Sequence, residues 1–288
     1  MKLLIKILMK CLSFTDVLDS GIWAELKTVQ NPTLKKLATS LPTIALSSRQ
    51  SGTVRNYTAG FKKWKEWAAN FSEVVTLPAD PSFVSLYLVN VLQNSNTHSP
   101  IYNAFYSISW AHQLAGLPDP TIHHLPRRVK EASIRLLGHG NNKKEPVSPF
   151  NLSEIVTKYA NEKSSASDLR VATMCILAYA GFMRFDELSN IMASDIVFEP
   201  TYVKIFIEKA KNDVHREGHW VIIAKTSTPT CPVVLLSRYL NVLNIKLDED
   251  VYLFRALKYM RKTKSYAFRV KNEPIKYTRA REIILEAF

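Results

Sequence analysis

The spacing of apolar residues changes near the middle of the chain, and this change constrains the fold more than any other feature. Up to about residue 137, apolar residues recur every three or four positions, which is typical of amphipathic helices. Residues 138–149, GHGNNKKEPVSP, have no such period and predict a linker. Beyond them, helical patterns alternate with short segments of strand character. We therefore predict a mainly α chain, in which an all-α domain precedes an α+β domain.

The first half of the chain carries the start and stop signals of four helices. A stripe from Val54 to Ala68 predicts one helix, and Asp80-Pro81 and Ser99-Pro100 are each an N-cap followed by proline at the first helical position. A fourth helix is predicted after Pro126, with Val129, Ser133, Leu136 and Leu137 directed inward and Gly138 at its end. These helices predict a compact module over residues 45–137, and residues 1–44 are predicted to be a poorly defined leader.

The second half combines helices with a small sheet. Residues 151–154 resemble a capping box, and Ser167 is the predicted cap of an apolar helix that ends at Gly181. Alternating segments near residues 196–198, 203–207 and 220–223 predict a three-stranded antiparallel meander. A helix is predicted from Cys231-Pro232 to about Asn244, and another over residues 278–288, whose apolar stripe continues to Phe288. We read that stripe as the sign of a domain cut short.

Charge is concentrated in two blocks. The formal net charge is +13; residues 1–140 hold 15 basic and 8 acidic side chains, residues 141–250 hold 13 and 14, and residues 251–288 hold 10 and 3. Two basic blocks around a near-neutral body favour a polyanionic partner, with nucleic acid ahead of a membrane surface. No run of about 18 uncharged apolar residues predicts a membrane span. The N-terminal stretch lacks the apolar core of a signal peptide, because Lys6 and Lys10 interrupt it.

The sequence predicts neither a cofactor nor a metal. It contains no GxGxxG, GxxxxGK[ST] or GxSxG motif. The three cysteines have no metal-ligand spacing and favour a reducing, intracellular compartment, nuclear if the source is eukaryotic. His215 and His219 flank a turn before a strand, which favours a solvated turn over a metal site. His123 and His124 are closer in character to phosphate or solvent contacts than to zinc ligands.

Two segments are hard to explain by packing. In GFMRFDEL, residues 181–188, Arg184 follows a helix end among hydrophobic residues, so it is exposed, directed at an anion, or paired with Glu187 or Asp186. In EKAKND, residues 208–213, lysines occupy the turn between two predicted strands, which by itself is typical of a solvated hairpin tip.

Taken together and in this order, these segments resemble the tyrosine recombinase (phage-integrase-like) family, especially transposon-encoded members of the DIRS and Crypton sort. The match comprises the helix from Arg55-Asn-Tyr57 to Trp67, GFMRFDEL, the strand pair ending in KAKNDVHREGHWVII, and the run from Tyr252-Leu-Phe254 to Tyr277-Thr-Arg-Ala-Arg. It covers about residues 45–288. The resemblance implies a SAM-like helical core-binding domain at 45–137 and an integrase-like catalytic domain at 150–288.

The resemblance also implies a chemistry. In this family a tyrosine attacks a DNA phosphodiester without a metal, and cations stabilise the charge that develops on phosphorus. Arg184 matches the first catalytic arginine, and Lys211 matches the lysine that serves as general acid, with Lys209 as the alternative. Glu187 matches the acidic residue of the first box, which we interpret as orienting the arginines. The expected phosphate contacts of the DNA-binding surface are Arg49, Arg55, Lys62, Arg127, Arg128 and Lys130.

The chain departs from the family in its last part. The second box, His-x-x-Arg, and the nucleophilic tyrosine that follows it are not found after residue 219, and Tyr266 and Tyr277 precede the place where that box is expected. Three interpretations stay open: a recombinase fragment that binds DNA but does not cleave it alone, a non-catalytic DNA-binding module derived from such an element, or an unrelated basic scaffold or adaptor. Double-stranded DNA is the predicted partner, and assembly of several copies on DNA is left open.

Overall fold

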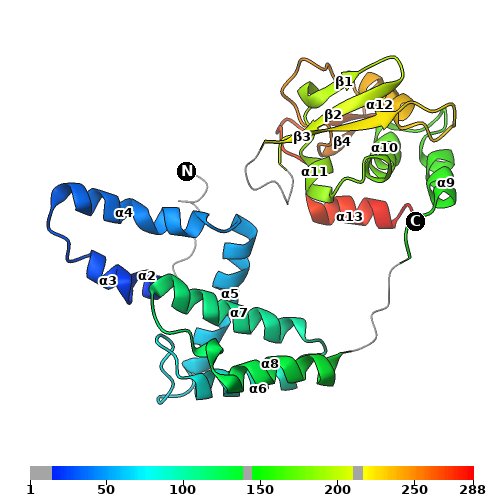
Figure 1. Cartoon of the computed structure of the whole chain (residues 1–288). Coiled ribbons are helices and arrows are strands. Elements are labelled where there is room, and N and C mark those ends of the chain that lie inside the picture. Colours follow the sequence, from blue (N-terminus) through cyan, green and yellow to red (C-terminus); the bar gives the residue numbers. More distant parts are fainter. Residues whose placement is uncertain (1–14, 139–144, 210–216) are drawn as a thin grey trace. The chain divides into compact units, whose positions relative to one another are not determined.

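The computed structural model describes residues 15–138, 145–209 and 217–288. The chain divides into two compact units, residues 1–143 and residues 144–288, which we call the N-terminal unit and the C-terminal unit (Figure 1). The division falls inside the segment for which the sequence predicts a linker. Half of that segment, residues 139–144, lies outside the described residues, as do Lys211 and His215.

The N-terminal unit is all-helical. Its elements are α2 (Thr15–Asp19), α3 (Ile22–Leu26), α4 (Pro32–Ser47), α5 (Ser51–Ala68), α6 (Pro81–Gln93), α7 (Ser99–Ala115), the 3₁₀ turn η1 (Pro120–Ile122) and α8 (His124–Leu137). The first three differ from the prediction of a poorly defined leader over residues 1–44. They are fixed by tertiary contacts: Val17 of α2 is fully buried, and the Trp23 indole donates to the Leu114 carbonyl over 2.8 Å.

The predicted apolar stripes form the core of this unit. Phe61, Trp64, Leu88, Ile101 and Ile108 are fully buried together on α5, α6 and α7. Since each large apolar side chain that leaves water contributes about 1.5–3 kcal/mol, this cluster is the main source of the unit's stability. Helix α7 ends as predicted at Gly116, which has a φ of 68°.

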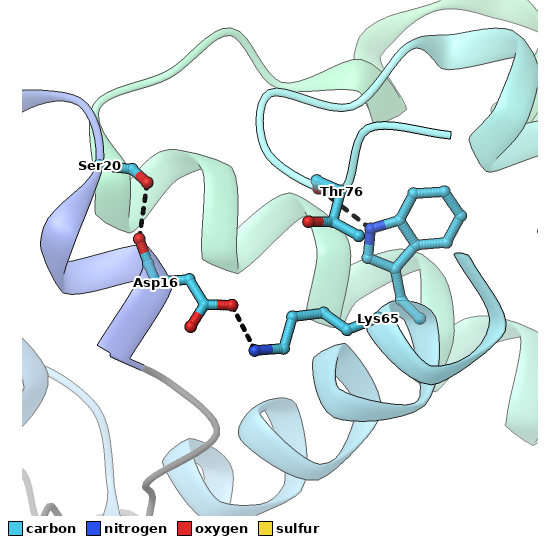
Figure 2. Close-up of polar contacts among 5 residues, drawn as sticks. Asp16, Ser20, Lys65 and Thr76 are labelled. Atoms are coloured by element: carbon cyan, nitrogen blue, oxygen red, sulfur yellow. Dashed lines mark hydrogen bonds and ion pairs between the residues drawn. The ribbon is translucent and has the colours of Figure 1, made fainter. Parts of the chain in front are cut away.

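Two close contacts fix α5 against its neighbours. A Cβ at Gly60 of α5 would lie 2.1 Å from the Ser107 Oγ of α7, so only glycine allows this approach. Lys65, also on α5, forms an ion pair with Asp16 of α2, whose carbonyl accepts from the Ser20 hydroxyl (Figure 2).

Two predicted details of helix α8 are corrected. Helix α8 begins before Pro126, because the His123 side chain accepts a hydrogen bond from the Leu125 N–H and caps the helix. Ser133 is buried as predicted, but Leu136, predicted to face inward, is 67 % exposed.

The C-terminal unit is α+β. Its elements are α9 (Pro149–Tyr159), α10 (Ala166–Ala180), α11 (Phe185–Ser189), η2 (Ala193–Asp195), β1 (Ile196–Phe198), β2 (Tyr202–Ile207), β3 (His219–Ala224), α12 (Pro232–Val242), β4 (Leu257–Met260), β5 (Ser265–Phe268) and α13 (Tyr277–Leu285). Strands β1, β2 and β3 form the predicted antiparallel meander, with β2 in the middle. The prediction of a mainly α chain with a small three-stranded antiparallel sheet is confirmed.

Alternation along β2 explains how the sheet joins the core. Val203, Ile205 and Ile207 are buried, whereas the residues between them are partly exposed. The buried row packs in one cluster with residues of α10 and α12, among them Leu177 and Tyr239. Figure 1 shows the three strands beside one another in this unit.

Two predictions for the C-terminal unit are corrected, and one pair of strands was not predicted. The capping box of α9 is formed by Ser148 and Asn151 rather than by residues 151–154, and α10 is capped by Ser165, which pairs with Asp168, rather than by Ser167. The sequence also did not predict the second antiparallel pair, β4 and β5. No helix in the described part of the chain is both long and apolar enough to cross a lipid bilayer.

Candidate functional site

The turn after α10 positions Arg184. The helix ends at Gly181, where a Cβ would lie 3.1 Å from the Leu177 carbonyl and 2.8 Å from Met183. Phe182 then adopts a φ of 49° and is 93 % exposed, while Met183 returns to the core. A non-glycine residue in the left-handed region is uncommon and marks a locally constrained backbone. This turn places Arg184 at the start of the short helix α11.

Glu187 holds both the backbone and the side chain of Arg184. One carboxylate oxygen accepts from the Arg184 backbone N–H over 2.8 Å, and the other forms an ion pair with Nη1 over 3.0 Å. Glu187 is 9 % exposed, whereas the Arg184 side chain is 54 % exposed. The local pair that the sequence left open is therefore present. The guanidinium keeps further N–H donors for a phosphate, because arginine has five.

A cavity of about 140 Å³ lies beside this pair. It brings Glu187 of α11 together with Lys209, which follows β2, although the two are 22 positions apart. Lys209 forms an ion pair with the neighbouring Glu208 over 3.1 Å, and both side chains are well exposed. Lys211, the preferred general acid, lies outside the described residues.

Asp195 is a further carboxylate that lines the cavity. Burial raises the pKa of Asp195 above its usual value, and the negative charges of Glu208 and Asp250 act in the same direction. Within the described ranges, no group of three or more His, Cys, Asp or Glu side chains is arranged to hold a metal ion. The lining of the cavity therefore holds the Lys209 amine and three carboxylates, those of Glu187, Asp195 and Glu208, and Glu187 is the residue that pairs with Arg184.

The predicted phosphate contacts of the N-terminal unit lie on separate segments. Arg55 and Lys62 are exposed on α5, Arg127 and Arg128 are exposed in the first half of α8, and Arg49 is exposed after α4. Lys62 forms an ion pair with Glu66 at 3.5 Å. A pair of two exposed charges such as this one contributes little to stability.

Lys130 differs from these residues, because aromatic rings hold its ammonium group. Its Nζ lies 4.6 Å from the centroid of the Phe105 ring, and 5.6 Å and 5.5 Å from those of Tyr102 and Tyr106. Cation–π contacts of this kind fix the position of the amine without neutralising its charge. The structure thus brings Lys130 onto the tyrosine row of α7.

Sequence reasoning missed a groove on α5 and α7. It has a volume of about 320 Å³ and is lined by Asn56, Tyr57, His98, Ser99, Tyr102, Asn103 and Tyr106. The spacing of His98, Tyr102 and Tyr106 at i, i+4 and i+8 was the available signal, since such residues share one helix face.

Sequence reasoning also missed Arg170 of α10, which is only 4 % exposed. Its Nη1 donates to the Arg255 carbonyl over 2.9 Å, and burial lowers its pKa below the usual value. Arg170 is thereby a packing residue that links α10 to the start of the β4–β5 region.

A sequence comparison finds a curated relative. Over 204 residues the chain is 27 % identical to an integrase/recombinase xerD homolog from Selenomonas ruminantium. The match covers 69 % of this chain and 58 % of that protein, so the chain spans little more than half the length of this relative. No protein-family model matches the chain.

Solved structures of low sequence identity are also similar to the chain. The XerA recombinase has a TM-score of 0.33 at 14 % identity, over 85 % of this chain and 76 % of that one. The Tn1549 transposon integrase, in complex with circular intermediate DNA, has a TM-score of 0.43 at 12 % identity, over 96 % and 79 %. Ndc10, a platform for inner kinetochore assembly in budding yeast, has a TM-score of 0.32 at 9 % identity, over 87 % and 65 %. The sequence match to the xerD homolog supports a relationship between this chain and the tyrosine recombinase/integrase family.

Proposed function

We propose that this chain is a DNA-binding protein of the tyrosine-recombinase type that acts in DNA recombination or integration. The observation that carries the proposal is the geometry of Arg184, whose half-exposed guanidinium is fixed by the almost buried carboxylate of Glu187. The charged end of Arg184 thus lies at the surface, where a phosphate can reach it. A fixed planar fork of N–H donors suits two oxygens of a DNA phosphate.

In the proposed site, Arg184 binds the phosphate that becomes more negative during strand transfer, and Glu187 holds Arg184 in place rather than reacting. Lys211, or Lys209 in its place, supplies the proton to the departing 5′ oxygen. The position of Lys209 on the cavity that Glu187 also lines supports the second assignment. No metal or other cofactor takes part in this proposal.

The N-terminal unit supplies the phosphate contacts that hold the duplex. Such contacts require exposed side chains, and five of the six residues are exposed: Arg49, Arg55, Lys62, Arg127 and Arg128. The ammonium group of the sixth, Lys130, is held by the aromatic rings of α7. Contacts of this kind fix the register on the duplex and carry little sequence information. The same proposal extends to the transposon-type subgroup and to assembly of several copies on DNA. It also extends to an intracellular location, which is nuclear if the source is eukaryotic.

We further propose that residues 1–288 bind DNA without cutting it. The sequence after residue 219 contains no His-x-x-Arg, and no tyrosine follows Tyr277. The chemistry needs a nucleophile and a second arginine in addition to Arg184. A site without these groups still binds phosphate, because binding needs only the cationic side chains.

One gel experiment tests both parts of the proposal. The full chain is incubated with a nicked suicide duplex at low and moderate salt, and free, bound and covalently attached DNA are separated. We expect a retarded complex that weakens steeply with ionic strength and no covalent band. Arg127→Ala with Arg128→Ala is expected to lower the affinity about tenfold or more at 0.1 M salt and to reduce the salt slope by about 2.

Lys35→Ala with Lys36→Ala is the matched control, because it removes the same charge from the exposed surface of α4. Equal loss in both variants would mean that net charge alone governs binding. A covalent band would contradict the proposed incompleteness, and no binding at low salt would leave the unrelated basic scaffold as the better interpretation. Binding without covalent attachment agrees with a fragment and with a non-catalytic module derived from a recombinase.

A further inference from the structure

The β4–β5 hairpin concentrates positive charge more than any other described element. Its strands pair Leu257 with Phe268 and Met260 with Ser265, and four residues, Arg261 to Lys264, connect them. The segment from Arg255 to Lys271 holds seven basic residues and no acidic one. The hairpin was not predicted from the sequence, and no role in the proposed site uses it.

The charges of the hairpin are free to meet a partner. Six of the seven basic residues are exposed: Lys258, Arg261, Lys262, Lys264, Arg269 and Lys271. None of the six forms an ion pair within the described ranges. Exposed lysines on a protein surface are commonly balanced by nearby acids, whereas a cluster of one sign creates a local field that attracts polyanions.

The base of the hairpin is held firmly. The Arg255 guanidinium lies 3.9 Å from the centroid of the Phe268 ring, and the Arg255 carbonyl accepts from the buried Arg170. The Arg269 N–H donates to the Ala256 carbonyl over 3.0 Å. The hydrogen bond from Arg170 attaches the hairpin to α10, the helix that leads to Arg184, and the other two contacts hold the two sides of its base together.

The outer part of the hairpin carries groups suited to a sugar–phosphate backbone. Tyr259 is 53 % exposed, although its ring packs against that of Tyr266 with the centroids 5.2 Å apart. Lys264 occupies the left-handed region with a φ of 49°, a place where glycine or asparagine is favoured. A lysine in that position costs stability and adds a cation to the tip of the hairpin.

We infer that the β4–β5 hairpin is a second DNA-binding element, which contacts the phosphate backbone through its lysines and arginines. The inference rests on the proposed function, because it takes duplex DNA as the polyanion. It adds a contact site in the C-terminal unit that is separate in sequence from Arg184 and from the basic residues of the N-terminal unit. A backbone contact of this type raises affinity for all sequences alike.

The test measures binding of a labelled duplex to variants of the full chain by fluorescence anisotropy. The salt concentration is varied from about 0.05 to about 0.3 M, because the effect of counterion release on affinity is measurable over this range. Lys262→Ala with Lys264→Ala is expected to bind about tenfold or more weakly at 0.1 M salt and to reduce the salt slope by about 2. The control Lys35→Ala with Lys36→Ala, which loses the same charge, is expected to bind as the unchanged chain does. Thermal unfolding of each variant verifies that it is folded.

Lys264→Gly separates DNA contact from a structural role. Glycine relieves the left-handed backbone, so the melting temperature is expected to rise while DNA affinity falls about fivefold and the salt slope falls by about 1. A purely structural lysine would not produce a more stable protein that binds more weakly.

The outcomes distinguish this inference from the proposed function. If Arg127→Ala with Arg128→Ala weakens binding but the hairpin variants bind like the unchanged chain, the hairpin inference is wrong and the proposed function stands. Equal losses in the hairpin variant and in the α4 control also overturn the inference, because net charge would then suffice. If the unchanged chain binds no DNA at low salt, the proposed function fails and the inference fails with it.

Discussion

At the scale of single residues, His112 shows how a polar group becomes part of a core. It is fully buried in α7, where Nδ1 contacts the Ile108 carbonyl at 2.8 Å and Nε2 accepts from the Ala79 N–H at 2.9 Å. This pattern requires the neutral ring with its proton on Nδ1. Burial lowers the pKa of His112 below 6.5, despite the opposing effects of the Ile108 carbonyl and Asp119.

The depressed pKa of His112 predicts acid sensitivity of the N-terminal unit. Below about pH 6.5 the unfolded chain binds a proton that the folded unit resists, so stability is full above that pH and decreases as the pH falls toward the folded pKa. Tryptophan fluorescence during thermal unfolding measures this, because four of the five tryptophans, Trp23, Trp64, Trp67 and Trp110, belong to this unit. In His112→Gln the part of the pH slope that His112 causes is expected to vanish; an unchanged slope would assign it to other groups.

At the scale of elements, the ion pair of α11 joins two residues with different roles. Glu187 stabilises the start of the helix, whereas Arg184 presents its guanidinium to a phosphate in the proposed function. Glu187 accepts the Arg184 N–H and is nearly buried, so its removal leaves the start of the helix unsatisfied. Arg184 contributes only a half-exposed guanidinium to the pair. The two members of one ion pair are therefore expected to differ in their effect on stability.

We expect Glu187→Ala to lower the free energy of unfolding by about 2 kcal/mol, because a charged hydrogen bond and the helix start are lost. Arg184→Ala is expected to cost under about 1 kcal/mol, since the guanidinium is screened by solvent. Urea unfolding of the C-terminal unit, followed by circular dichroism, measures both. Equal costs would indicate that Arg184 serves mainly to stabilise the turn.

The elements themselves show where sequence patterns suffice. The start of α6 at Pro81 and the three strands of the meander depend on near neighbours, and they were predictable. The β4–β5 hairpin was not, because its connection contains no Asn-Gly or Asp-Gly and places Lys264 in the left-handed region instead. Its pairing is stabilised by the contact of Arg255 with Phe268 and by the core beneath it.

At the scale of the whole molecule, the chain has two independent cores. The buried cluster of the N-terminal unit extends from Val17 to Ala115, and that of the C-terminal unit from Leu152 to Ile283. Each unit is of a size that ordinarily supports a stable domain. Neither cluster includes a residue of the other unit.

We therefore expect residues 1–143 and residues 144–288, expressed separately, each to unfold in one cooperative transition. Their melting temperatures are expected to lie within about 5 °C of the corresponding transitions of the full chain, a shift equivalent to about 1 kcal/mol. Calorimetry of the two pieces and of the full chain tests this. A piece that stays unfolded alone would show that its core depends on the other unit.

The sequence by itself determined the fold class, the starts of α6 and α12, and the local acids with which Arg184 could pair. Each depends on residues three or four positions apart, where geometry is fixed by the helix or strand. Only the tertiary structure decided which distant residues meet: Glu187 with Lys209 on one cavity, Lys130 with the α7 tyrosines, and Arg170 with the base of the basic hairpin. Those contacts depend on how elements far apart in the chain pack together, which no local spacing encodes.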